Sequence, residues 1–265
     1  MEKRKKVGLV FGGGGARGLA HIGVLKVLLE NNIPIDYIAG TSIGAWVAAH
    51  YALHHDLEKL TEITVGKKRE KLAVLLNIKG GVVSEKKVKK LLYEWLGDND
   101  FSETKIPLAV VAADLVSGKR VVLKQGKVPE AVYASMAVPG IFTPIYLAGQ
   151  ILVDGGVVDP LPSRLAREMG ADLVIAVNLT KHYPPKDSQK KISLFENINI
   201  SFRLMSRRLA EYSFADADIV IEPKIICKDF LGIKKYFFDQ AGPEIMASGE
   251  EAARESLLAI KKILE

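Results

Sequence analysis

The sequence predicts an α/β protein, a three-layer α/β/α sandwich around a central, mostly parallel sheet. Short apolar stretches of strand length alternate with amphipathic helical patterns along most of the chain, which is typical of layered α/β folds. The composition fits a globular protein, with 48% hydrophobic and 26% charged residues. A single domain of 265 residues can bury about 75% of its unfolded surface, so it needs no disulfide or metal to fold.

The first part of the chain contains two strand–turn–helix units. A compact apolar stretch runs into four consecutive glycines, and a helical pattern follows until two asparagines and a proline stop it. A second strand then leads through a small-residue turn into a second helix. The expected elements are strand 7–11, helix 19–30, strand 35–39 and helix 43–53.

The later part of the chain predicts further strands and a closing helix. We expect a strand with a hairpin partner across Ser117-Gly118, then three short strands, then a long helical pattern. In order, these elements are strand 107–113, its partner 120–124, strands 151–153, 173–177 and 218–221, and helix 241–264.

We expect one domain over residues 1–265, with its motif-bearing core over about 7–220. Two segments fit the layering poorly, because 56–100 is charged and helical without a strand, and 181–208 is basic with isolated apolar residues. Both segments are expected to cover the scaffold. A lid is one interpretation, and a plain surface insertion is the other.

Composition excludes several classes of protein. Cys227 is the only cysteine, so neither an intramolecular disulfide nor a cysteine-rich zinc site is expected. No run of 18 apolar residues is present, and the apolar stretch after the basic residues 3–6 is too short for a signal peptide. We therefore expect a cytoplasmic protein, at most peripheral to a membrane, without metal or cofactor. No oligomeric state is predicted.

The positive charge of the chain is local. The formal net charge is +6, and residues 59–90 alone carry ten Lys/Arg against three Asp/Glu. Such a segment attracts anions, which could be nucleic acid, anionic lipid head groups or acidic substrates. A solvated helix face is the alternative. Nucleic acid is the weakest candidate, because aromatic residues near the segment are limited to Tyr93 and Trp95.

The glycine turn allows two interpretations. Gly13-x-Gly15-x-x-Gly18 between a strand and a helix matches a dinucleotide-binding fingerprint, which would make the protein an oxidoreductase. However, Asp36 opens the second strand, whereas the ribose-binding acid closes it. The backbone N–H groups of the turn could instead hold the oxyanion of a tetrahedral intermediate. Arg17 could orient this loop or bind a substrate phosphate.

A second turn contains a candidate nucleophile. Gly40-Thr41-Ser42-Ile43-Gly44 is a G-x-S-x-G pattern between a strand and a helix. A nucleophile elbow needs small residues on both sides of the serine, because the serine lies in a strained turn with its hydroxyl accessible. The alternative is a glycine-rich helix entry in which Ser42 is an ordinary cap residue.

A serine nucleophile needs a base. The order Ser…Asp/Glu…His of α/β-hydrolases leaves His182 as the candidate histidine, in an irregular segment without a motif. Asp154 is the better candidate, because it follows a strand and precedes two glycines that permit a tight turn. The remaining histidines are interpreted as packed or solvated side chains: His21, His50, His54 and His55.

Several blocks together resemble the signature of the patatin-like phospholipase family, over about residues 7–220. Each block is weak alone, whereas the ordered set is highly specific. The three main blocks are Gly13-Gly14-Gly15-Ala16-Arg17-Gly18, Gly40-Thr41-Ser42-Ile43-Gly44 and Asp154-Gly155-Gly156. Two further similar blocks are the stretch Ala134 to Phe142 and the helix start Gly18 to Leu25.

The resemblance implies a serine acyl hydrolase that cleaves lipid esters through an acyl-enzyme. Ser42 would be the nucleophile and Asp154 its base, without a catalytic histidine, and the oxyanion hole would come from Gly13, Gly14 and Gly15. Gly12 replaces the aspartate of the plant storage forms, and the aspartate block reads Asp-Gly-Gly instead of Asp-Gly-Ala. Both variants resemble the bacterial branch.

Two further expectations depend on this resemblance. A non-catalytic lipid-binding or regulatory protein on the same fold is the main alternative, because motifs can outlive activity. The basic segment 59–90 follows the helix after Ser42, so an anionic membrane surface becomes its leading partner.

Overall fold

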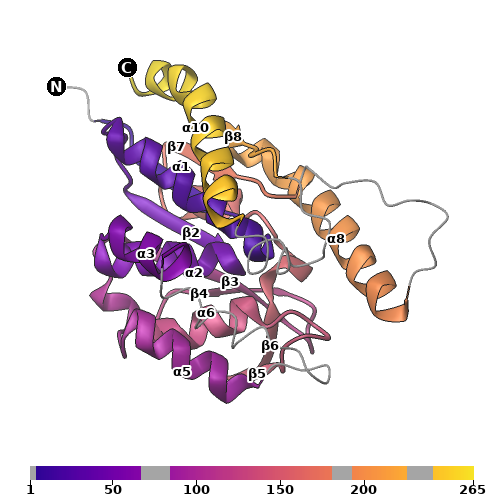
Figure 1. Ribbon diagram of the computed structural model, residues 1–265. Helices are drawn as coiled ribbons and strands as arrows, with labels where there is room; N and C mark the ends of the chain where they lie inside the picture. The colour runs from indigo at the N-terminus through magenta and orange to yellow at the C-terminus, as the bar shows by residue number, and fades with distance from the viewer. Residues whose placement is uncertain (1–3, 67–83, 181–192, 226–240) are drawn as a thin grey trace.

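The computed structural model describes residues 4–66, 84–180, 193–225 and 241–265 (Figure 1). Its centre is an eight-stranded sheet in the order β5-β6-β3-β2-β1-β7-β8, with β4 paired to β3. Strands β1, β2, β3, β7 and β8 pair in parallel, β4 and β6 are antiparallel to β3, and β5 is antiparallel to β6. The strands are β1 Val7–Phe11, β2 Tyr37–Thr41, β3 Leu108–Asp114, β4 Arg120–Leu123, β5 Ile145–Leu147, β6 Gln150–Asp154, β7 Leu173–Val177 and β8 Ile219–Ile221.

The helices form a thick layer on one face of the sheet and a thin layer on the other. The α-helices are α1 Leu19–Glu30, α2 Ile43–His54, α3 Leu57–Thr64, α5 Glu85–Leu96, α6 Val128–Met136, α7 Ser163–Glu168, α8 Leu194–Tyr212 and α10 Gly242–Leu264. The short 3₁₀ helices are η1 Gly15–Gly18, η3 Phe101–Glu103, η4 Gly155–Val157 and η5 Ser213–Asp216.

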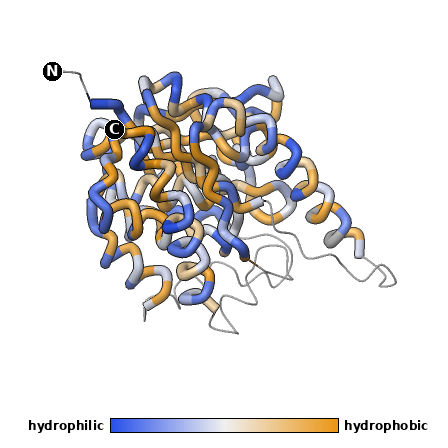
Figure 2. Tube along the Cα trace, turned by 90° about the horizontal axis from the view of Figure 1, so that it is seen from above, coloured by the Kyte–Doolittle hydropathy of each residue, from blue (hydrophilic) through white to orange (hydrophobic). Residues whose placement is uncertain are grey.

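Alternation along the buried strands separates two hydrophobic clusters. In β1, Val7, Leu9 and Phe11 belong to the large cluster that includes α1, α2, α5 and α6, whereas Val10 points to the other face. The small cluster joins the sheet to α7 and to Ala210 of α8. Figure 2 shows the strands as an apolar tract through the middle of the molecule. The predicted three-layer α/β/α sandwich is confirmed, with layers of unequal thickness.

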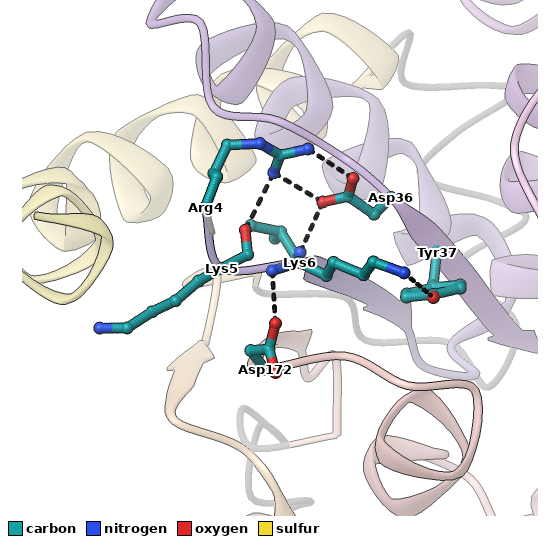
Figure 3. Close-up of polar contacts among 7 residues, drawn as sticks. Arg4, Lys5, Lys6, Asp36, Tyr37 and Asp172 are labelled. Carbon is teal, nitrogen blue, oxygen red and sulfur yellow. Dashed lines mark hydrogen bonds and ion pairs between the residues drawn. The ribbon is translucent and has the colours of Figure 1, made fainter. Parts of the chain in front are cut away.

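Two aspartates accept hydrogen bonds from the backbone at the amino edge of the sheet (Figure 3). Asp36 accepts the backbone N–H of Val7 at 2.7 Å and pairs with Arg4, whose Nη2 lies 2.6 Å from Oδ1. Asp172 accepts the N–H of Lys6 at 2.8 Å. The Arg4 guanidinium beside Asp36 holds the pKa of that carboxyl below its usual value. Asp36 therefore stabilises the start of β1, at the edge of the sheet opposite the glycine turn.

Most predicted elements lie within two residues of the observed ones. The second strand is the largest shift, because pairing with β1 and β3 extends it to Thr41, directly before Ser42. The prediction missed α6, β5 and α7, which are short and lack a clear period. The described part of 56–100 is helical as expected, and its apolar residues pack into the large cluster. One domain over 1–265 stays a prediction.

Helix α10 packs against α1 through two glycines (Figure 1). A Cβ atom on Gly23 would lie 2.0 Å from the carbonyl oxygen of Met246, and one on Gly249 would lie 2.0 Å from that of Ala20. No side chain fits at either distance. The closing helix can therefore dock only where both backbones lack a side chain.

We expect Gly23→Ala to destabilise the protein by about 2 kcal/mol, because the added methyl group forces α1 and α10 apart. In a helix without this contact, the same change would stabilise by about 1 kcal/mol. Urea unfolding followed by circular dichroism measures the difference. Glu251→Ala, at an exposed position of α10, is the matched control and should change little. A Gly23→Ala protein as stable as the parent would contradict the packing argument.

Candidate active site

Ser42 lies in a strained turn between β2 and α2. Its φ is +57° with ψ at −129°, a backbone conformation that costs a residue with a side chain about 1–3 kcal/mol. The flanking glycines are required by space: a Cβ on Gly44 would lie 2.2 Å from the carbonyl oxygen of Phe11, and one on Gly40 would lie 2.7 Å from the backbone of Ala45. The geometry is that of a nucleophile elbow.

Ser135 holds this turn from α6. Its hydroxyl accepts the backbone N–H of Ser42 at 2.8 Å and donates to the carbonyl of Val111 at 2.6 Å, in a fully buried position. Ser135 thus links the elbow to β3. The sequence placed this serine in a family-like block without indicating any role for it, and only the fold shows what it contacts.

Asp154, the last residue of β6, meets Ser42 directly. The Ser42 hydroxyl donates to its Oδ2 at 2.5 Å, and the N–H of Gly156 donates to its Oδ1 at 2.7 Å. Burial raises the pKa of Asp154 to about 7, while these two hydrogen bonds act in the opposite direction. A carboxyl of this pKa can take up and release a proton near neutral pH.

The glycine turn offers two free backbone donors beside Ser42. The N–H of Gly13 donates to the carbonyl of Pro160 at 2.9 Å, so it is engaged. The N–H groups of Gly14 and Gly15 have no hydrogen-bond partner among the described residues, and both glycines line the same pocket as Ser42. Of the three predicted oxyanion donors, the geometry therefore favours Gly14 and Gly15.

Arg17 is buried and bonded to the backbone of the loops around it. Its Nε donates to the carbonyl of Gly14 at 2.9 Å, and its Nη1 donates to that of Leu179 at 2.8 Å. These bonds join the glycine turn to the end of β7. Of the two roles that the sequence left open, this geometry supports orientation of the loop.

None of the described histidines lines the pocket, and two of them are fully buried. His21 is buried against Phe11 with its Nε2 bonded to the carbonyl of Gly12, and burial lowers its pKa to about 4. Burial likewise lowers the pKa of His50 to about 3. No histidine is found among the described residues that line the pocket. His182, the alternative base, lies outside the described residues.

The pocket around Ser42 and Asp154 is closed on one side by α8. Ser206 donates to the carbonyl of Gly156 at 3.0 Å, which fixes the helix beside the carboxylate. The described part of 181–208 therefore lies over one side of the site, and its interpretation as a lid or as a surface insertion stays a prediction. The lining residues from α8 are Phe202, Arg203, Leu204, Ser206 and Arg207, and Val138, Pro160 and Thr180 lie among the others.

The basic segment 59–90 has no described residue in the pocket lining. Lys89 on α5 pairs with Glu85 at 2.9 Å and lies 3.9 Å from Glu130. Lys67, Lys68 and Arg69, at its centre, lie outside the described residues. Contact of this segment with a membrane stays a prediction.

The mostly parallel sheet brings the serine elbow next to a buried aspartate. The class is therefore an α/β protein with a candidate Ser–Asp site. The chain belongs to the patatin-like phospholipase family, whose model matches residues 9–167. This match spans the glycine turn, the elbow and Asp154, and it confirms the resemblance seen in the sequence.

Curated relatives agree with this family. The chain is 34% identical over 196 residues to an uncharacterised NTE family protein of Mycobacterium tuberculosis, covering 71% of this chain and 53% of the relative. It is 33% identical to human patatin-like phospholipase domain-containing protein 6 (65% and 13% covered) and 30% identical to lysophospholipase NTE1 of Pyricularia oryzae (66% and 12%). The chain thus spans about half the length of the mycobacterial relatives and a small part of the others.

Two solved structures share the fold. VipD from Legionella pneumophila superposes with a TM-score of 0.61 at 14% identity, over 97% of this chain and 67% of VipD. The type III effector ExoU gives a TM-score of 0.51 at 14% identity, over 97% of this chain and 53% of ExoU. At such low identity, the likeness concerns the fold alone.

The buried carboxyl of Asp154 should destabilise the native protein at neutral pH. Its pKa is about 7 when folded and about 3.9 when unfolded, so the native state binds more protons. The cost is absent below pH 4, grows as the pH rises to 7, and is complete above that. We expect Asp154→Asn to be more stable than the parent by about 1–2 kcal/mol at pH 8 and equally stable at pH 4.

Thermal unfolding at both pH values measures this difference. Asp98→Asn, an exposed carboxyl, is the matched control without a pH-dependent gain. Equal stability of Asp154→Asn and the parent at pH 8 would show that the carboxyl is not desolvated.

Proposed function

We propose that the protein is a serine acyl hydrolase that cleaves fatty-acyl esters of lipids or phospholipids. The observation that carries the proposal is the 2.5 Å hydrogen bond from the Ser42 hydroxyl to the buried carboxylate of Asp154. It joins a nucleophile at an elbow to a base with a pKa of about 7. Family membership supports the same class of reaction.

Acylation would proceed in two steps at this pair. The Ser42 Oγ attacks the ester carbonyl carbon while its proton passes to Asp154 Oδ2. The negative charge on the carbonyl oxygen is stabilised by the N–H groups of Gly14 and Gly15, a contribution of about 3 kcal/mol for each donor. The intermediate then expels the alcohol, which takes the proton back from Asp154 and leaves an acyl-enzyme.

Deacylation would use the same groups in the reverse order. A water molecule replaces the alcohol and gives a proton to Asp154 as its oxygen attacks the acyl carbon. The fatty acid leaves as Ser42 recovers that proton, so the enzyme returns to its first state. The step uses no histidine and no metal ion in the proposed scheme.

A lipid substrate is supported by the lining of the pocket and by the relatives. Val138, Phe202 and Leu204 offer apolar surface for an acyl chain, and Arg203 and Arg207 bring positive charge to the same pocket. Guanidinium groups suit a phosphate head group. Two of the relatives have phospholipase or lysophospholipase in their names, which is consistent with an ester of this kind.

A lipid-binding or regulatory protein without turnover is the second candidate, since the same site would bind a lipid without hydrolysing it. The dinucleotide alternative loses further support, because Asp36 is bonded to Arg4 and Val7 at the opposite edge of the sheet. Contact of segment 59–90 with an anionic membrane remains a separate proposal, which the vesicle experiment below also tests.

Ser42→Ala and Asp154→Asn should each lower kcat/KM for ester hydrolysis by about 1,000-fold or more, because each removes one member of the reacting pair. A panel of phospholipids, lysophospholipids and p-nitrophenyl esters measures the rates. A fluorophosphonate probe should label the parent and not Ser42→Ala. Ser256→Ala on α10, distant in the fold, is the matched control. A parent that neither turns over esters nor reacts with the probe would favour the lipid-binding candidate.

The pH profile should report the carboxyl of Asp154. Only the ionised form accepts the Ser42 proton, so kcat/KM for a neutral p-nitrophenyl ester should fall about tenfold per pH unit below a pKa near 7. Above that pH it should be level. A profile that stays level down to about pH 5 would indicate a solvated carboxyl or another base.

A further inference from the structure

The exposed large apolar side chains are concentrated on a few elements. Among the described residues, nine of the ten lie on α8, on β5, in η4 or directly after β3, and the tenth, Leu258, lies on α10. Soluble proteins rarely leave a contiguous apolar patch of this kind without a partner. The nine are Leu115, Val116, Tyr146, Val157, Leu194, Ile198, Leu204, Met205 and Tyr212.

Four of these side chains form a stripe along the outer face of α8. Leu194, Ile198, Met205 and Tyr212 are spaced by four, seven and seven residues, so they fall on one side of the helix. They are 54–81% exposed. Phe202, four residues after Ile198 and three before Met205, borders the stripe and lines the pocket, and Ser206 lies further around the helix, also in the pocket lining. One helix therefore carries an exposed apolar face next to a wall of the candidate active site.

Three more exposed apolar side chains lie at the carboxyl edge of the sheet. Leu115 and Val116 follow β3, which is parallel to β2 and so ends at the same edge as Ser42. The N–H of Leu115 bonds to the carbonyl of Ile151, and Ile151 pairs with Tyr146 on β5. These residues lie on the edge at which Ser42 and Asp154 meet. Figure 1 shows α8 extending away from the sheet at its side.

We propose that this apolar docking surface, the α8 stripe with Leu115, Val116 and Tyr146, binds the surface of a lipid bilayer or micelle with anionic head groups. The inference rests on the proposed function, since the lipid surface would then supply the substrate. The stripe would enter the boundary of head groups and acyl chains, as amphipathic interfacial helices do. The pocket, which α8 lines through residues that border the stripe, would receive an ester from that layer.

The charge of this region favours an anionic lipid surface over a second copy of the chain. Arg207 and Arg208 both contact the single carboxylate of Glu211, at 3.5 and 2.8 Å, so this turn of α8 keeps a net positive charge. The whole chain has a net charge of +6. A two-fold dimer through the stripe would set these like charges against each other, whereas anionic head groups complement them.

The test uses a triple variant, Leu194→Ser with Ile198→Ser and Met205→Ser, in the full chain. None of these residues lines the pocket. In flotation with vesicles of phosphatidylcholine and phosphatidylglycerol, we expect its vesicle affinity to fall about tenfold or more. Leu258→Ser removes an equally exposed side chain on α10 and should bind as the parent does. The parent should bind vesicles of phosphatidylcholine alone more weakly.

Two readouts keep the docking proposal separate from the proposed function. The triple variant should hydrolyse a monomeric p-nitrophenyl ester at the parent's rate and lose hydrolysis of vesicle lipid. Ser42→Ala should bind vesicles as the parent does. If the parent binds vesicles without hydrolysing any ester, the docking surface stands and the proposed function fails.

Three outcomes would overturn the docking surface. The first is a triple variant that binds vesicles as tightly as the parent. The second is vesicle binding abolished by charge reversal at Lys67, Lys68 and Arg69 and unchanged by the triple variant, which would assign binding to segment 59–90. The third is a parent that is dimeric in light scattering and a triple variant that is monomeric, which would assign the stripe to a second copy.

Discussion

The candidate active site depends on one interaction, the hydrogen bond between Ser42 and Asp154, and the surrounding structure positions these two residues. A carboxylate buried this deeply needs a donor for each oxygen, and the Ser42 hydroxyl and the Gly156 N–H supply them at 2.5 and 2.7 Å. The two residues are 112 positions apart in the chain. They meet because β3 lies between β2 and β6: Thr41, the last residue of β2, is paired with Val111, and Asp154, the last residue of β6, is paired with the next residue, Ala112.

Close backbone approach is the condition for that meeting, and it explains glycines in the serine block and in the aspartate block. Gly44 passes the carbonyl of Phe11, Gly155 passes that of Val111, and a Cβ on either would lie 2.2–2.3 Å from the oxygen. The same crowding fixes the donors around the serine: Ser135 takes the Ser42 N–H, and Pro160 takes that of Gly13. What remains beside the hydroxyl is the pair of N–H groups of Gly14 and Gly15. The specificity of the motif set thus has a steric origin.

The sequence was sufficient for the layered fold, for most strands and helices, and for the serine and aspartate as candidates. These features depend on local signals: apolar runs, helix stops and glycines in a fixed order. The sequence was insufficient where the answer depends on distant partners. Nothing in the sequence shows that the Gly13 N–H is engaged, that Arg17 bonds to Leu179, or that Ser135 supports the elbow. The charge of the basic segment 59–90 suggested an anionic partner, but no described residue of this segment lines the pocket.

The unequal layers connect the fold to the proposed lipid substrate. On the thick face, α1 and α10 pack so closely that glycines separate them, and the core there is continuous. On the thin face, α8 is joined to the core through its last turns, where Ala210 is buried and Ser206 bonds to Gly156. Its earlier turns expose Leu194 and Ile198. This helix covers the sheet only in part, because its apolar stripe is exposed and has no partner within the described chain. In the docking proposal, a lipid layer would supply the missing partner where an acyl ester has to enter, so one helix would serve both as pocket wall and as contact with the substrate phase.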